Sequence, residues 1–337
     1  MVFEHLFPDS LLERKEWSAF FLAIIYSVIS IFLARLLFPS NSGIVSVVFL
    51  SIFLIPYFET ILKREEKQEM KDRKRTFFKL LKDNYDIVKT YYFLFMGVYL
   101  TYMLFAFFAP YFGVNVGLMF KEQLSLGGFS GAVTFNTATF SSILFNNWWV
   151  LLACFLIALI AGDGAIFFVA WNASTWGAIF GYRAIVSSTN SGESAIIALL
   201  IIVVITLPHL LLEAGAYILA AISGGVISDE INHPSEVRKF VLYIFISGLL
   251  FLLVYKLLGI MFVSHPYLLE LLAMLLIIGL LYLMRFVLED RGDIEVFTFN
   301  LHLFVFAVGI FVLGAIIETL VLYNATPLRH IYSMLGN

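Results

Sequence analysis

The sequence predicts an all-α membrane protein that crosses the bilayer many times. Of its 337 residues, 61% are hydrophobic and only 13% are charged, and the mean hydropathy is +0.94. A soluble domain has about 45–50% apolar and about 25% charged residues, so this composition indicates an integral membrane protein. The apolar residues form uninterrupted runs of about 20 residues, whereas a β-barrel would alternate with period two. We therefore expect about eight to ten transmembrane helices, some of them broken or re-entrant.

The charge and cysteine content exclude several classes of function. A net charge of −3 gives no reason to expect nucleic acid as a partner. The single cysteine, Cys154, lies within an apolar run, so no internal disulfide is expected. The polar N-terminus is followed by an apolar run long enough to span, which argues against a removable signal peptide.

Residues 1–135 are expected to form an N-terminal membrane region. Three apolar runs, at 17–38, 43–62 and 91–112, predict three spans. Between the second and third, residues 63–89 hold ten of the 21 lysines and arginines. By the positive-inside rule this basic loop is cytoplasmic, which places the N-terminus in the cytoplasm and the chain in the cell membrane.

Residues 136–337 are expected to form a second membrane region whose helices are less regular. Residues 113–147 are moderately polar and suit a re-entrant or interfacial element. The apolar stretch 148–182 is too long for one span and should break at Gly162-Asp163-Gly164. The stretch 194–228 is also too long, and Pro208 should kink or divide it. Three further spans follow, near 239–263, 267–286 and 297–323.

Small residues at a spacing of four predict the faces on which these helices pack. Such spacing lets two helices approach closely in a membrane. The residues are Gly177 and Gly181 on one segment and Ala216, Ala220 and Gly224 on the other.

Several polar residues are predicted at membrane depth, where an ionisable group is costly and marks a functional candidate. His209 and Glu213 are four apart and so share one helix face. The other candidates are Asp163 and Glu318 together with the amides Asn147 and Asn172. One interpretation is that these groups hydrogen-bond across helices and hold the bundle together. The other is a site between helices in which His209, Glu213 and Glu318 bind a divalent metal such as zinc or relay protons.

These residues carry a resemblance to a known family. Pro208-His209, then Glu213 and the run ending in Gly224-Gly225, resemble the proline-histidine-glycine…glutamate signature of stage II sporulation protein M. Asn146-Asn147, the break at 162–164, Asn172 with Gly177, and Glu318 to Pro327 are similar to other segments of that family, in order. The resemblance covers roughly residues 137–327. Leu210 stands where the family usually has glycine.

The resemblance implies a polytopic membrane protein without established catalytic residues. In spore-forming bacteria the sporulation protein itself works with cell-wall hydrolases during engulfment. By analogy, the chain is expected to be a scaffold that organises partners in a membrane or cell-envelope complex, either other membrane proteins or copies of itself.

Two other classes of function stay open on the residues alone. A metal-dependent intramembrane hydrolase would use a metal-bound water at His209, Glu213 and Glu318. An ion-coupled transporter or channel would explain broken helices with polar residues near the middle of the membrane. Gly128-Phe129-Ser130-Gly131 matches the GxSG pattern of rhomboid proteases, but the sequence after His209 lacks their small-residue pattern. No P-loop, dinucleotide fingerprint or HExxH motif is present.

Overall fold

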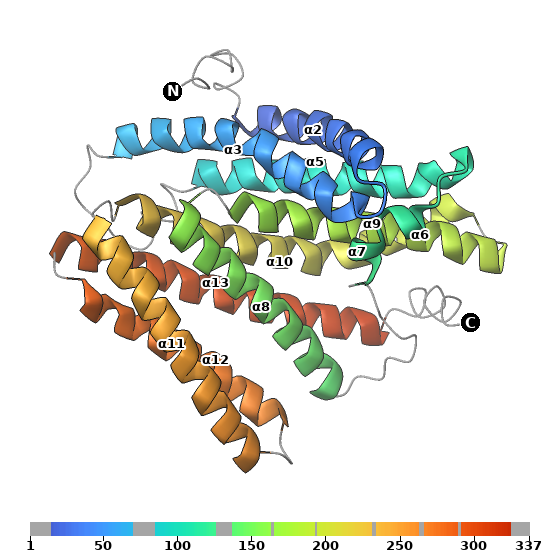
Figure 1. Cartoon of the computed structure of the whole chain (residues 1–337). Coiled ribbons are helices and arrows are strands. Elements are labelled where there is room, and N and C mark those ends of the chain that lie inside the picture. Colours follow the sequence, from blue (N-terminus) through green and yellow to red (C-terminus); the bar gives the residue numbers. More distant parts are fainter. Residues whose placement is uncertain are drawn as a thin grey trace.

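A computed structural model describes the chain as a bundle of long helices (Figure 1). The described residues are 15–69, 85–125, 137–162, 165–192, 194–230, 234–262, 266–288 and 291–324. Within these ranges the regular elements are all helices, with no strand. The fold class predicted from composition is therefore confirmed, and the chain is an all-α, polytopic membrane protein.

Four helices form the first part of the bundle. These are α2 (Lys15–Leu37), α3 (Ser42–Glu69), α5 (Tyr85–Phe108) and α9 (Ala165–Ser191). The most extensive contacts are between α5 and α9 and between α5 and α2. Glycine makes both contacts close. A Cβ atom on Gly97 of α5 would lie 2.6 Å from the Phe20 carbonyl oxygen of α2. Gly177 and Gly181 of α9 likewise face the Tyr99 and Met103 carbonyl oxygens of α5.

Short helical segments cover one end of this part. After α5 the chain passes through η1 (Ala109–Phe112), α6 (Val116–Met119) and α7 (Lys121–Ser125). Gln123 Nε2 donates to the Gly43 carbonyl oxygen at 3.0 Å, and Ser42 Oγ donates to the Met119 carbonyl oxygen at 2.9 Å. These bonds fix the short helices to the start of α3. The predicted re-entrant stretch thus begins as two short helices, and residues 126–136 lie outside the described part.

Three helices form the second part of the bundle. These are α8 (Thr137–Ala161), α10 (Ala195–Glu230) and α13 (Arg291–Asn324). Helix α10 packs on α8 and α13 and also on α9, so it joins the two parts. Ala216 and Ala220 are fully buried on α10. One turn further on, Gly224 faces the Phe155 carbonyl oxygen of α8. Helix α5 comes before the expected boundary between the two membrane regions at residue 136, and α9 comes after it. Their packing therefore joins the two expected regions.

A helical hairpin lies beside the second part of the bundle. It consists of α11 (Pro234–Met261) and α12 (Pro266–Leu283), followed by η3 (Met284–Val287). Figure 1 shows both helices running obliquely away from the rest of the bundle. Tyr243 of α11 donates its hydroxyl to the Leu280 carbonyl oxygen of α12 at 2.8 Å, which ties the two helices together.

The described residues contain seven helices that are long and apolar enough to cross a membrane, fewer than the eight to ten expected. Two differences explain the lower number. The apolar part of α3, Ser42–Phe58, is shorter than the others, and α9 is not among the seven. Helix α9 instead buries polar side chains inside the bundle: Asn172, Ser174, Thr175, Arg183 and Ser187.

The two long apolar stretches behave differently. The chain does break after α8, where Gly162 adopts a left-handed φ of 53° that glycine tolerates best. By contrast, α10 is one continuous helix of 36 residues that contains Pro208, so the expected division there is wrong. This helix packs against α5, α8, α9 and α13. At 1.5 Å per residue α10 is about 54 Å long, which exceeds a hydrocarbon core of about 30 Å.

The adjacent glycines at 224 and 225 allow a matched test of this packing. A Cβ on Gly224 would collide with the backbone of α8, whereas a Cβ on Gly225 would have nothing within 4 Å. We expect Gly224→Ala to lower the free energy of unfolding by about 1–3 kcal/mol. Gly225→Ala should leave it unchanged or raise it by at most about 1 kcal/mol. Denaturation of both variants in mixed micelles measures the difference, and equal stabilities would contradict the described α8–α10 contact.

Candidate functional site

A buried polar cluster joins the three helices of the second part of the bundle. Asn147 of α8 donates its Nδ2 to Oε1 of Glu213 on α10 at 3.0 Å. The Glu213 carboxyl group in turn lies beside the carboxyl group of Glu318 on α13. Glu213 is 0% exposed and Glu318 is 2% exposed, so both carboxyl groups are removed from the surface. We call Asn147, Glu213 and Glu318 the carboxyl cluster.

The neighbouring residues on each helix explain how the two carboxyl groups meet. On α13, Gly314 lies one turn before Glu318, and a Cβ there would lie 3.2 Å from Cγ of Glu213. The missing side chain therefore lets Glu213 lie directly against α13. On α10, Tyr217 follows Glu213 by one turn and is also buried.

The chemistry of the cluster depends on a shared proton. A carboxylate only accepts hydrogen bonds, so a hydrogen bond between two carboxyl groups requires a proton on one of them. Two like charges in contact away from water repel strongly, which favours the same singly protonated state. The amide of Asn147 then stabilises the remaining negative charge as a donor. The arrangement can therefore hold one proton between α10 and α13.

His209 lies on α10 one turn before Glu213, but its surroundings are different. Its ring packs edge-on against Trp176 of α9, with centroids 6.3 Å apart and planes at 76°. The side chain is buried, and its Nδ1 has no hydrogen-bond partner among the described residues. The structure therefore brings Glu213 and Glu318 together and directs His209 toward α9.

The three-residue metal site stays a prediction. Within the described part of the chain, no group of three or more His, Cys, Asp or Glu side chains is arranged to hold a metal ion. Glu213 and Glu318 together offer two carboxylate ligands, and a third from His209 would require its ring to leave Trp176.

Asn172 and Pro208 are not members of the carboxyl cluster. Asn172 of α9 donates Nδ2 to the Phe168 carbonyl oxygen of its own helix at 2.8 Å. Pro208 is exposed on α10. Asp163 lies outside the described residues.

Two further polar contacts of α10 were not anticipated from the sequence. Tyr92 of α5 donates its hydroxyl to the Leu211 carbonyl oxygen at 2.8 Å, beside Gly215, where a side chain would collide with that hydroxyl. Ser223 donates Oγ to the Asn300 carbonyl oxygen of α13, and both residues are buried. Gly215 within a helix was the available signal for the first contact, because glycine there costs about 1 kcal/mol unless packing requires it. The second contact gives no sequence signal, since serine and asparagine are common in such helices.

Comparison with protein families, with curated proteins and with solved structures found no match to this chain.

The neighbouring asparagines at 146 and 147 test the energetic role of the cluster. Asn147→Ala removes the amide that donates to Glu213, and a buried acceptor left without its donor costs about 1–3 kcal/mol. Asn146 is exposed, and its Nδ2 donates to Asn147 Oδ1 only at a long 3.4 Å, so Asn146→Ala should change the free energy of unfolding by less than about 0.5 kcal/mol. Thermal and denaturant unfolding of the two purified variants measure both values. Equal losses would contradict the assignment of Asn147 to the cluster.

Proposed function

We propose that this integral membrane protein is a non-catalytic scaffold that organises partners in a membrane complex. The observation that carries the proposal is the contrast between α11 and the rest of the bundle. None of the most apolar window of α11 is buried inside the protein, whereas 61% of the corresponding window of α5 is buried. A helix that is apolar on all sides and has few protein neighbours is suited to contact lipid or a partner helix.

The glycines of the hairpin support a partner rather than lipid alone. Inside the bundle Gly97, Gly177, Gly181 and Gly224 each lie against the backbone of a neighbouring helix. Gly248 of α11 and Gly279 of α12 are exposed, and a Cβ on either would have nothing within 4 Å. Glycine is costly inside a helix, and small residues in membranes are typical of helix contacts. We infer that these two glycines receive a helix of another membrane protein or of a second copy.

The carboxyl cluster would make the second part of the bundle a rigid platform for such a scaffold. It ties α8 to α10 through a hydrogen bond and places Glu318 of α13 beside Glu213, and a fixed platform lowers the entropy lost when a partner binds. The resemblance of residues 137–327 to the stage II sporulation protein M family points to the same kind of role. In this proposal the protein lies in the cell membrane with its N-terminus and residues 63–89 in the cytoplasm.

Substitution of the hairpin glycines tests the scaffold. Gly248→Leu and Gly279→Leu should preserve the fold, because both sites are open, and should block close approach of a partner helix. After crosslinking in native membranes, the wild type is expected to copurify with a stoichiometric partner that mass spectrometry identifies. Each hairpin variant should reduce its recovery about tenfold, while Gly309→Leu on α13, also an open site, should not. A wild-type protein that purifies alone as a monomer would overturn the proposal.

Ion-coupled transport is the second candidate, and the shared proton of Glu213 and Glu318 favours it. Ionisable groups in contact at membrane depth are typical of proton relays. If the pair carries protons, liposomes containing the protein should show potential-driven proton uptake by a pH-sensitive dye. Glu213→Gln and Glu318→Gln should each abolish the uptake, because an amide cannot release the proton, while the fold is kept by the same hydrogen bonds. Uptake that persists in both variants, or is absent from the wild type, would exclude this function for the pair.

A further inference from the structure

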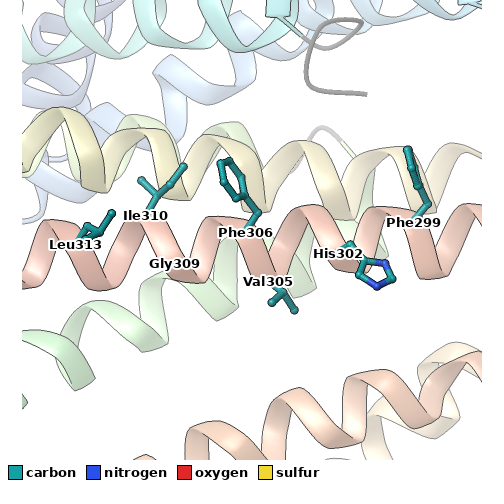
Figure 2. A pocket seen from close by; sticks show the side chains of 7 residues that line it. All are labelled: Phe299, His302, Val305, Phe306, Gly309, Ile310 and Leu313. Atoms are coloured by element: carbon teal, nitrogen blue, oxygen red, sulfur yellow. The ribbon is translucent and has the colours of Figure 1, made fainter. Parts of the chain in front are cut away.

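A shallow hollow of about 740 Å³ runs along α13 on a face turned away from the carboxyl cluster. Figure 2 shows the residues that line it, Phe299, His302, Val305, Phe306, Gly309, Ile310 and Leu313, along nearly four turns of the helix. All except His302 are apolar or lack a side chain, so the hollow is a hydrophobic groove with one polar residue toward one end. We call it the α13 groove.

The depth of the α13 groove depends on Gly309. A Cβ built on this glycine would have nothing within 4 Å, and the residue is exposed. In Figure 2 the side chains of Phe306 and Ile310 flank the bare backbone at Gly309. A leucine at this position would therefore fill the groove without pushing on another helix.

Polar groups gather at the His302 end of the groove. The His302 Nδ1 lies 2.6 Å from the Thr298 carbonyl oxygen, so this nitrogen donates. The ring packs edge-on against Tyr282 of α12, with centroids 6.0 Å apart. Arg285 follows Tyr282 by one turn, is exposed, and stacks its guanidinium over the Phe286 ring at 4.7 Å. A fixed positive charge therefore stands where α12 meets α13.

An apolar groove with a positive charge near one end is complementary to a phospholipid molecule. His302 lies in the eleventh position after the start of α13 at Arg291, and the groove continues from there toward the middle of the helix. An acyl chain matches the apolar length, and a phosphate matches the guanidinium at its end. Basic residues between transmembrane helices at the membrane surface bind lipid headgroups in the same way.

We propose that the α13 groove is a binding site for a phospholipid with a single phosphodiester. The acyl chain lies over Gly309 between Phe306 and Leu313, and the phosphate pairs with Arg285. Glu295 is exposed on α13 seven residues before His302 and so shares its face, which disfavours a headgroup of several negative charges.

Native mass spectrometry of the full-length, delipidated protein tests this site. The probes are phosphatidylglycerol and a diacylglycerol with the same acyl chains, which lacks the phosphate. The wild type should bind one phosphatidylglycerol about tenfold more tightly than the diacylglycerol. Arg285→Gln should make the two affinities equal, and Gly309→Leu should weaken both. Gly225→Ala, at an open site on α10, should change neither.

Two results would overturn the proposal. Equal binding of both probes by the wild type would show that Arg285 does not recognise a phosphate. Unchanged binding in a folded Gly309→Leu variant, checked by its thermal unfolding and size-exclusion profile, would show that the acyl chain lies elsewhere. Because Gly309→Leu and Gly248→Leu act on different surfaces, loss of lipid and loss of a protein partner are separable.

Discussion

The bundle depends on one constraint of the bilayer, which is that a polar group removed from water must find its partner within the protein. Glu213 meets this constraint through Oε1, which accepts from Asn147 on α8, and its carboxyl group also lies beside Glu318 on α13. Each contact crosses between helices, so the position of α10 is defined by chemistry as well as by packing. A carboxyl group without these partners would destabilise the bundle, because its burial would be uncompensated. The polar cluster and the close glycine contacts therefore work together.

The same constraint explains how glycine is used. Each helix carbonyl already accepts a bond from its own helix, so two helices touch through backbone only where a side chain is absent. Gly97, Gly181 and Gly224 all meet this condition against a neighbouring carbonyl oxygen. Gly314 is a variation, since it accommodates the Glu213 side chain rather than backbone. Glycines at open positions differ from these, because no contact within the chain requires a side chain to be absent there.

Composition was enough to predict the fold class, and the glycine break after α8 was enough to place one helix end. Pro208 does not divide α10, although proline commonly ends a helix, and the expected kink stays a prediction. The contact between Glu213 and Glu318 joins residues more than 100 positions apart, and no local pattern contains that pairing. His209 shares a face with Glu213 by periodicity, yet Trp176 of another helix determines its direction. Residue spacing predicts which face of a helix a side chain occupies. The residue that it contacts on another helix is known only from the tertiary structure.

The buried position of α9 has a consequence for how the protein enters the membrane. Insertion machinery selects helices by their hydropathy, and α9 is not among the seven helices that qualify on that basis. Its polar residues, including Arg183 and Asn172, are covered by other helices rather than by lipid. Helices α3 and α5 are synthesised before α9, and α10 follows directly after it. Helix α9 can therefore pack against α3 and α5, which are synthesised first. Its insertion into the bilayer is thus coupled to folding.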